Sequence, residues 1–168
     1  MAKIELQGFD EYLRKVQKLA DKSEPLCKKT VYSGAGILAD KMRDAVDSLP
    51  TISDGEALSS FKSGKVMSRI SYKQKKGLQE SLGISTIRKE RSGMVQTAVG
   101  FTGYNEVKTK HFPNGQPNAE VARSLEKGTS YLKRNRFVEN TIKANKSEII
   151  DAMSEAADDY IERIMEGD

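Results

Sequence analysis

The side chains that could carry catalysis are few and far apart in this sequence. The single histidine, His111, has no partner at the spacing of a metal site or a catalytic triad. Cys27 is the only cysteine, so it cannot form an intramolecular disulfide, and we interpret it as a small buried apolar group. Asp158 and Asp159 are adjacent, and adjacent residues on a helix do not face one another. The sequence therefore predicts a protein that is not an enzyme and that uses no metal and no cofactor.

A glycine-rich stretch, Ser33-Gly34-Ala35-Gly36, is the one pattern that could suggest phosphate binding by a loop. A nucleotide-binding loop needs a preceding strand and a following Lys-Ser/Thr pair, and neither is present at the required spacing. Each glycine inside a helix costs about 1 kcal/mol of helix propensity relative to alanine. Gly34 and Gly36 are thus predicted to allow close packing against another helix or a neighbouring subunit, and we include both as candidate interface residues.

Three basic clusters could contact phosphate groups. They are Lys73, Lys75 and Lys76; Arg88, Lys89 and Arg91; and Lys133, Arg134 and Arg136. Non-specific DNA binding needs only such charges, and Tyr72 and Tyr131 lie beside two of the clusters. No helix-turn-helix or other base-reading motif accompanies them. A small basic DNA-binding protein that acts through non-specific phosphate contacts is therefore an alternative hypothesis, beside solvated faces or the positive side of a subunit interface.

Charge is distributed unevenly along the chain. Residues 139–168 carry nine acidic and three basic side chains, a net charge of −6, which leaves +10 on residues 1–138. Opposite surfaces of this kind favour association between copies. The candidate interface pairs a basic patch on one copy with the acidic face of the final helix on the next, through Arg88, Lys89, Arg91, Asp151, Glu155, Asp158 and Glu162.

Apolar spacing predicts the elements of a single domain over residues 1–168. Apolar residues recur at helical spacing over 9–20, 23–49, 71–83, 117–127 and 138–164. Two further runs, 84–89 and 94–101, predict a β-hairpin around a polar loop. Ile4 and Leu6 alternate with polar residues and suggest a short strand or arm. The expected fold class is α+β, with two N-terminal helices and a long C-terminal helix packed on a small, mostly antiparallel β-sheet.

Residues 50–70 predict a long mobile loop. They mix serine, glycine and lysine with isolated apolar residues, and about 20 irregular residues are unusual inside a compact domain. In a ring-forming protein such a loop could project into the lumen or onto an adjacent ring, with Phe61, Lys62 and Lys65 as its contact residues.

Several motifs resemble a siphophage tail-component family of the gene-product-ten type. They are NGQPN at 114–118, ARSLEKGTS at 122–130, the opening IELQGFDEYL at 4–13 and KQKKGLQESLGI at 73–84, in the order of the family pattern. The resemblance covers most of the chain. It departs before and inside the last helix, where Arg136-Phe137 and Asn140-Thr141 replace a Pro-Phe pair and a Pro-Ala step.

The resemblance implies a structural virion protein of a tailed phage or prophage, a tail-completion or neck component that joins head and tail. It implies a homo-oligomeric ring, for which we expect a hexamer, with tail-terminator and head-connector proteins as neighbours. Packaged DNA is a further candidate partner, through non-specific contact, and no membrane is expected to take part. The expected location is the virion tail or neck, after assembly in the cytoplasm of the host bacterium.

Overall fold

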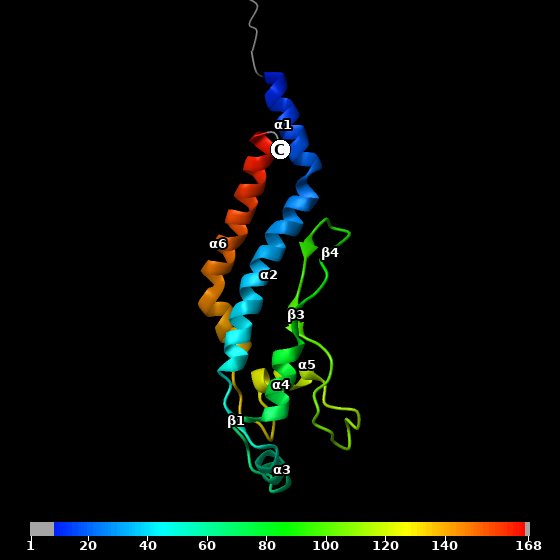
Figure 1. The fold of residues 1–168 in the computed structure, drawn as a ribbon, viewed down its shortest axis with the longest axis vertical. Coiled ribbons are helices and arrows are strands. Elements are labelled where there is room, and N and C mark those ends of the chain that lie inside the picture. The colour runs from blue at the N-terminus through cyan, green and yellow to red at the C-terminus, as the bar shows by residue number, and fades with distance from the viewer. Residues whose placement is uncertain (1–8, 167–168) are drawn as a thin grey trace, which may run out of the picture.

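A long helical hairpin forms the body of the molecule. The computed structural model describes residues 9–166, in which α2 (Ser23–Asp47) and α6 (Phe137–Glu166) lie side by side and α1 (Phe9–Asp21) extends beyond them (Figure 1). The residue before a proline is disfavoured in the helical conformation, and α2 ends shortly before Pro50. The three helices expected from apolar spacing over 9–20, 23–49 and 138–164 are confirmed.

Gly34 lets α2 and α6 approach closely. A β-carbon at this position would lie 2.6 Å from Cγ of Met153 on α6. Beside it, the Ser33 hydroxyl donates a hydrogen bond to the Ala152 carbonyl oxygen at 3.2 Å. At Gly36, in contrast, a β-carbon would meet no neighbouring atom within 4 Å. Close packing against another helix therefore explains Gly34 within the chain itself.

We expect Gly34→Ala and Gly36→Ala to shift stability in opposite directions. Both replacements gain about 1 kcal/mol of helix propensity, but only the methyl group at position 34 overlaps Met153. Forcing extra volume into a packed contact costs about 1–3 kcal/mol. The free energies of unfolding, measured by urea denaturation, should thus differ by about 2 kcal/mol in favour of Gly36→Ala. Equal stabilities would show that α2 and α6 do not pack through Gly34.

Three small two-stranded sheets replace the one sheet expected from the sequence. In the predicted hairpin, β3 and β6 pair antiparallel with Leu82 opposite Phe101, and β4 and β5 pair antiparallel with Lys89 opposite Val95. A parallel pair joins β1 to β2. The bounds are β1 Thr51–Ile52, β2 Ile70–Ser71, β3 Leu82–Ile84, β4 Arg88–Lys89, β5 Val95–Gln96 and β6 Val99–Phe101. The α+β class is confirmed, with β3 and β4 beside α2 on the side away from α6 and β1 beyond the end of α2 (Figure 1).

The core lies where α2 meets two short helices. These are α4 (Tyr72–Ser81) and α5 (Asn118–Lys127). A capping box begins α4, because the Ser71 hydroxyl accepts a hydrogen bond from the Gln74 amide and the Gln74 side chain accepts one from the Ser71 amide. The buried cluster comprises Met42, Val46, Leu49, Ile70, Leu78, Val121, Ala122, Leu125 and Phe137.

Residues 50–70 are not the irregular loop that their composition predicts. They contain α3 (Asp54–Lys62), which begins with a capping box between Ser53 and Glu56. The sequence does hold this Ser-x-x-Glu signature, although no apolar stripe follows it. No residue of α3 is buried. The helix is therefore held by its cap and its ends rather than by a core.

We expect the backbone amides of α3 to exchange with solvent much faster than those of α5. Amide protection follows burial and local contact density, and α5 is of similar length but has four buried residues. Hydrogen exchange followed by mass spectrometry checks this comparison within one sample. Equal protection of the two helices would contradict it.

Some finer expectations need correction. Gly83 does not close α4, since the helix ends at Ser81 and Gly83 pairs with Gly100 in the sheet. Cys27 is exposed rather than buried. The strand or arm expected at Ile4 and Leu6 lies outside the described residues. None of the helices within 9–166 combines the length and the apolar character that crossing a membrane requires.

Candidate functional site

Four carboxylates form an acidic stripe along α6. Spacings of four, three and four residues place Asp151, Glu155, Asp158 and Glu162 on one helical face, and all four are exposed. Asp151 accepts a hydrogen bond from the Ser147 hydroxyl at 3.3 Å. No lysine or arginine among the described residues forms an ion pair with any of the four. The ion pairs found among residues 9–166 therefore leave the charge of the acidic stripe unneutralised.

The hairpin made by β4, its polar turn and β5 is a basic arm. Arg88 and Arg91 are exposed on it and form no ion pair with a described residue. Lys89 instead pairs with Glu24 of α2, which also pairs with Lys28 at 2.7 Å. Hydrogen bonds from Lys28 and then Lys89 lower the pKa of Glu24 to about 2, so this anchor stays ionised at neutral pH. Lys89 is thus used within the chain, which leaves two arginines of the predicted patch for a partner.

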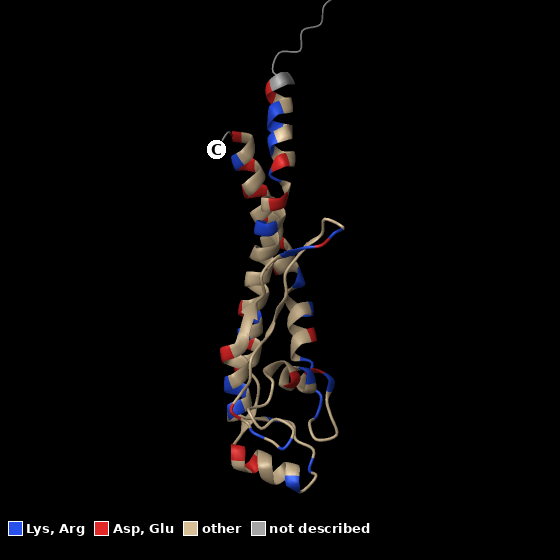
Figure 2. Ribbon diagram, turned by 90° about the vertical axis from the view of Figure 1, so that its right-hand side faces the viewer, with Lys and Arg blue, Asp and Glu red and all other residues tan. Residues whose placement is uncertain are grey.

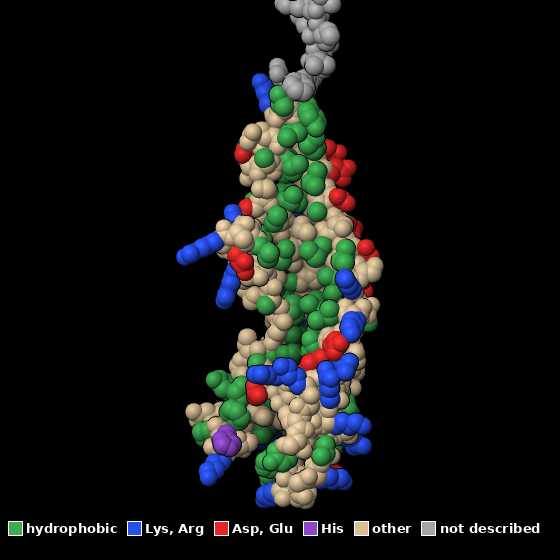
Figure 3. Space-filling view, turned by 180° about the vertical axis from the view of Figure 1, so that it is seen from behind, with side chains coloured by type: hydrophobic (Ala, Val, Ile, Leu, Met, Phe, Trp, Pro, Cys, Tyr) green, Lys and Arg blue, Asp and Glu red, His purple; other side chains and the backbone are tan. Residues whose placement is uncertain are grey.

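The basic arm and the acidic stripe lie on opposite sides of the body. The arm projects away from α2 on the side opposite α6 (Figure 1). Seen from behind, basic side chains project from one long edge, and acidic side chains line the upper part of the other edge, above a group of basic side chains (Figure 3). The two sequence-predicted surfaces therefore cannot meet within one molecule.

The residues assigned to the lumen or an adjacent ring lie on or just beyond α3. The Phe61 ring packs on the Tyr131 ring, with centroids 4.9 Å apart, yet both side chains remain exposed. Lys62 lies in the last turn of α3, where its positive charge interacts favourably with the helix dipole. Lys65 lines a surface hollow.

The three basic clusters differ in how far the fold uses them. Lys75 donates hydrogen bonds to the carbonyl oxygens of Asp47 and Leu49 at 2.7 and 3.1 Å, which caps the end of α2. Its neighbours Lys73 and Lys76 lie within 4.0 Å of carboxylates. The first cluster is therefore largely satisfied inside the chain.

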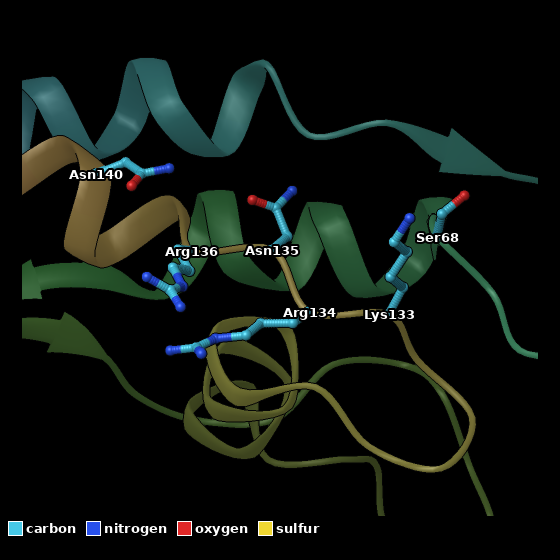
Figure 4. A pocket seen from close by; sticks show the side chains of 6 residues that line it. All are labelled: Ser68, Lys133, Arg134, Asn135, Arg136 and Asn140. Atoms are coloured by element: carbon cyan, nitrogen blue, oxygen red, sulfur yellow. The ribbon is translucent and has the colours of Figure 1, made fainter.

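The third cluster lines a cavity that we call the linker pocket. It has a volume of about 390 Å³ and is formed by Ser68, Lys133, Arg134, Asn135, Arg136 and Asn140 (Figure 4). Lys133 and Asn135 point to one side of the extended linker, and Arg134 and Arg136 point to the other (Figure 4). This alternation is that of an extended chain. The charge distribution around the linker is visible on the ribbon in Figure 2.

Glu126 has a role that spacing did not reveal. Its carboxylate accepts hydrogen bonds from the Val138 and Glu139 amides at 2.9 and 3.3 Å, and so caps the first turn of α6. Capping by a side chain from another helix leaves no local sequence signature. The cap joins the end of α5 to the start of α6.

We expect Glu126→Ala to lower the free energy of unfolding by about 1–2 kcal/mol, as the loss of other helix caps does. Glu126→Gln should cost less than about 1 kcal/mol, because the amide oxygen can still accept one bond while the charge on the helix dipole is lost. Thermal denaturation of both variants measures whether Glu126→Ala loses more stability than Glu126→Gln. Equal and negligible effects would mean that water serves the first turn of α6 instead.

The 114–118 motif has a structural role. Asn118 is buried, accepts from the Asn105 amide side chain at 3.3 Å and donates to the Thr102 carbonyl oxygen at 3.0 Å. A β-carbon on Gly115, whose φ is 118°, would overlap the Asn105 carbonyl oxygen. Gly115 and Asn118 therefore fix the approach to α5 and are buried, so they cannot form part of a binding surface.

The described part of the chain brings together no group of side chains that could hold a metal ion. No three His, Cys, Asp or Glu side chains within residues 9–166 come together as metal ligands. His111 is exposed in the segment before α5. What the described residues offer is a pair of oppositely charged surfaces and a basic pocket at the linker before α6.

Comparison with known proteins found no family model, no curated protein and no solved structure that matches this chain.

Proposed function

We propose that this protein is a structural component of the virion of a tailed phage or prophage, a tail-completion or neck protein that assembles as a ring between head and tail. The sequence motifs that resemble the tail-component family suggest this role. The observation that carries the proposed assembly is the placement of the basic arm and the acidic stripe on opposite sides of an elongated body.

Opposite placement favours a head-to-tail contact between copies. In such a heterologous contact one surface meets a different surface of the next copy, and the series closes into a ring when the rotation permits. An isologous dimer would instead bring like surfaces together around a two-fold axis. Arg88 and Arg91 on one copy can meet the acidic stripe of the next, while like charges resist the symmetric alternative.

An apolar band along the helical body supports association as well. Figure 3 shows hydrophobic side chains running down the upper part of the molecule, between projecting basic side chains on one edge and acidic side chains on the other. Large apolar side chains are exposed on α1 and α6, among them Tyr12, Leu13, Val16 and Ile150. Large contiguous apolar patches on a protein surface mark interaction sites. Apolar contact would supply affinity, and charge would set the register.

Native mass spectrometry tests the proposed function. We expect a closed ring, with a hexamer favoured, and a heavier complex after addition of a candidate tail-terminator or head-connector protein. A monomer in every mixture would overturn the proposal. A ring that binds neither the tail-terminator nor the head-connector protein would support self-assembly and contradict the role in joining the phage head to its tail.

A further inference from the structure

The linker pocket holds positive charge that the proposed ring contact does not use. All six lining residues carry hydrogen-bond donors, and none is acidic. Lys133 forms no ion pair with a residue of the described chain. Arg134 and Arg136 approach Glu139 at 3.9 and 3.7 Å, but Glu139 pairs more closely with Lys143, at 2.7 Å.

The charges around the pocket do not cancel. Glu139 stays ionised, because the hydrogen bond from Lys143 lowers its pKa and the nearby arginines lower it further. Glu126 is the other acidic side chain at this junction, and its carboxylate is already bound to amides of α6. Lys133, Arg134, Arg136 and Lys143 together exceed these two carboxylates by two positive charges.

The linker is held in place before any ligand arrives. The Lys133 amide donates to the Met67 carbonyl oxygen and the Asn135 amide to the Leu125 carbonyl oxygen, both at 2.7 Å. The Arg134 side chain donates from Nε to the Glu126 carbonyl oxygen at 3.0 Å. Fixed donors lose less conformational entropy when a ligand binds.

The first turn of α6 does not create this site. Glu126 already occupies the Val138 and Glu139 amides, so an anion in the linker pocket would be held by side chains. Arginine, lysine, serine and asparagine are the side chains that commonly contact phosphate oxygens in nucleic-acid complexes.

A second hollow continues the basic surface. It has a volume of about 430 Å³, shares Ser68 with the linker pocket, and carries Lys65 and Arg69. Its one acidic residue, Glu56, is bound to the amide and hydroxyl of Ser53 in the cap of α3. Two adjoining basic hollows suit a chain of repeated negative charges better than a single small anion.

We infer that the linker pocket and the hollow beside it bind the phosphodiester backbone of nucleic acid without reading its sequence. The polar lining and the cations on both sides of the linker match a phosphate backbone. Phe61 and Tyr131 are exposed close by along the chain and could stack on unpaired bases. This activity goes beyond ring assembly and does not depend on it.

Fluorescence anisotropy with labelled duplex and single-stranded DNA of one length tests the inference. The variant Lys133→Gln/Arg136→Gln removes one cation from each side of the linker and leaves Arg134, which bonds the Glu126 carbonyl oxygen. Loss of two phosphate contacts should lower the slope of log affinity against log salt by about 1.8 for duplex DNA, and lower affinity about tenfold at low salt.

Arg14→Gln/Lys22→Gln is the matched control, because it removes two exposed charges on and just after α1, far from the pocket. Its salt slope should match that of the wild-type protein, and both variants should keep the wild-type melting temperature. An equal loss in both variants would overturn the inference in favour of general charge attraction. The inference would also be overturned, in favour of an acidic protein partner, if poly-glutamate bound as tightly as DNA and lost affinity in the Lys133→Gln/Arg136→Gln variant to the same extent.

A preference for single strands would assign a role to Phe61 and Tyr131, and equal binding of both DNA forms would assign recognition to the backbone alone. Either result supports the inference. Sedimentation of the same variants reports ring assembly separately, so a failure of DNA binding is distinguishable from a failure of assembly.

Discussion

Reversing Asp158 and Glu162 to lysine should weaken self-association by about tenfold or more at low salt, because each attraction across the contact becomes a repulsion. Exposed ion pairs contribute only about 0–1 kcal/mol each, so the effect must come from several charges acting together. Salt screens exposed charges over about 10 Å at 0.1 M. The difference between wild type and variant should therefore shrink as salt is raised, which analytical ultracentrifugation measures directly.

A charge exchange provides the control. Arg88→Glu/Arg91→Glu should weaken assembly to a similar extent. In an equal mixture of this variant with the Asp158→Lys/Glu162→Lys variant, opposite charges meet only between unlike copies, so only those contacts should be restored. The quadruple variant carries both reversals on every copy and should assemble as the wild type does. Unchanged association without salt dependence would remove charge steering and leave the apolar band as the contact. Lys89 is kept in all variants because it anchors the arm to Glu24.

Replacing Leu125 by aspartate should unfold the protein or cost several kcal/mol of stability. Leu125 is 2% exposed in the central cluster, and burying an unpaired carboxylate there carries a large desolvation cost. The free energy of unfolding of a domain of this size is about 5–15 kcal/mol. This single change should therefore remove a large fraction of it. Urea denaturation followed by circular dichroism gives the free energy of unfolding.

Arg123→Asp is the matched control for Leu125→Asp. Arg123 lies on the same helix but is exposed, so its replacement should change stability by less than about 0.5 kcal/mol. The contrast separates burial from the effect of a new acid on α5. Similar melting temperatures for Leu125→Asp and wild type would contradict the position of α5 in the core.

The sequence by itself determined the long elements and their ends. The apolar spacing of α2 and α6 extends over many turns, and a helical pattern of that length favours one structure. The helices expected over 71–83 and 117–127 begin within one residue of α4 and α5, because a capping side chain such as that of Ser71 acts locally. The hairpin followed in the same way from two apolar runs around a polar loop.

Only the tertiary structure decided which basic clusters the fold uses and what Glu126 does, whereas the one local signal of α3 is its capping box. The α3 helix buries none of its residues, so it has no apolar stripe for a sequence to display. Lysines look alike in sequence, yet Lys75 caps α2 and Lys133 lines a basic cavity, because the difference depends on carbonyl groups supplied by distant segments. The placement of the basic arm opposite the acidic stripe likewise depends on which side of α2 each element packs, and local spacing carries no information about that choice.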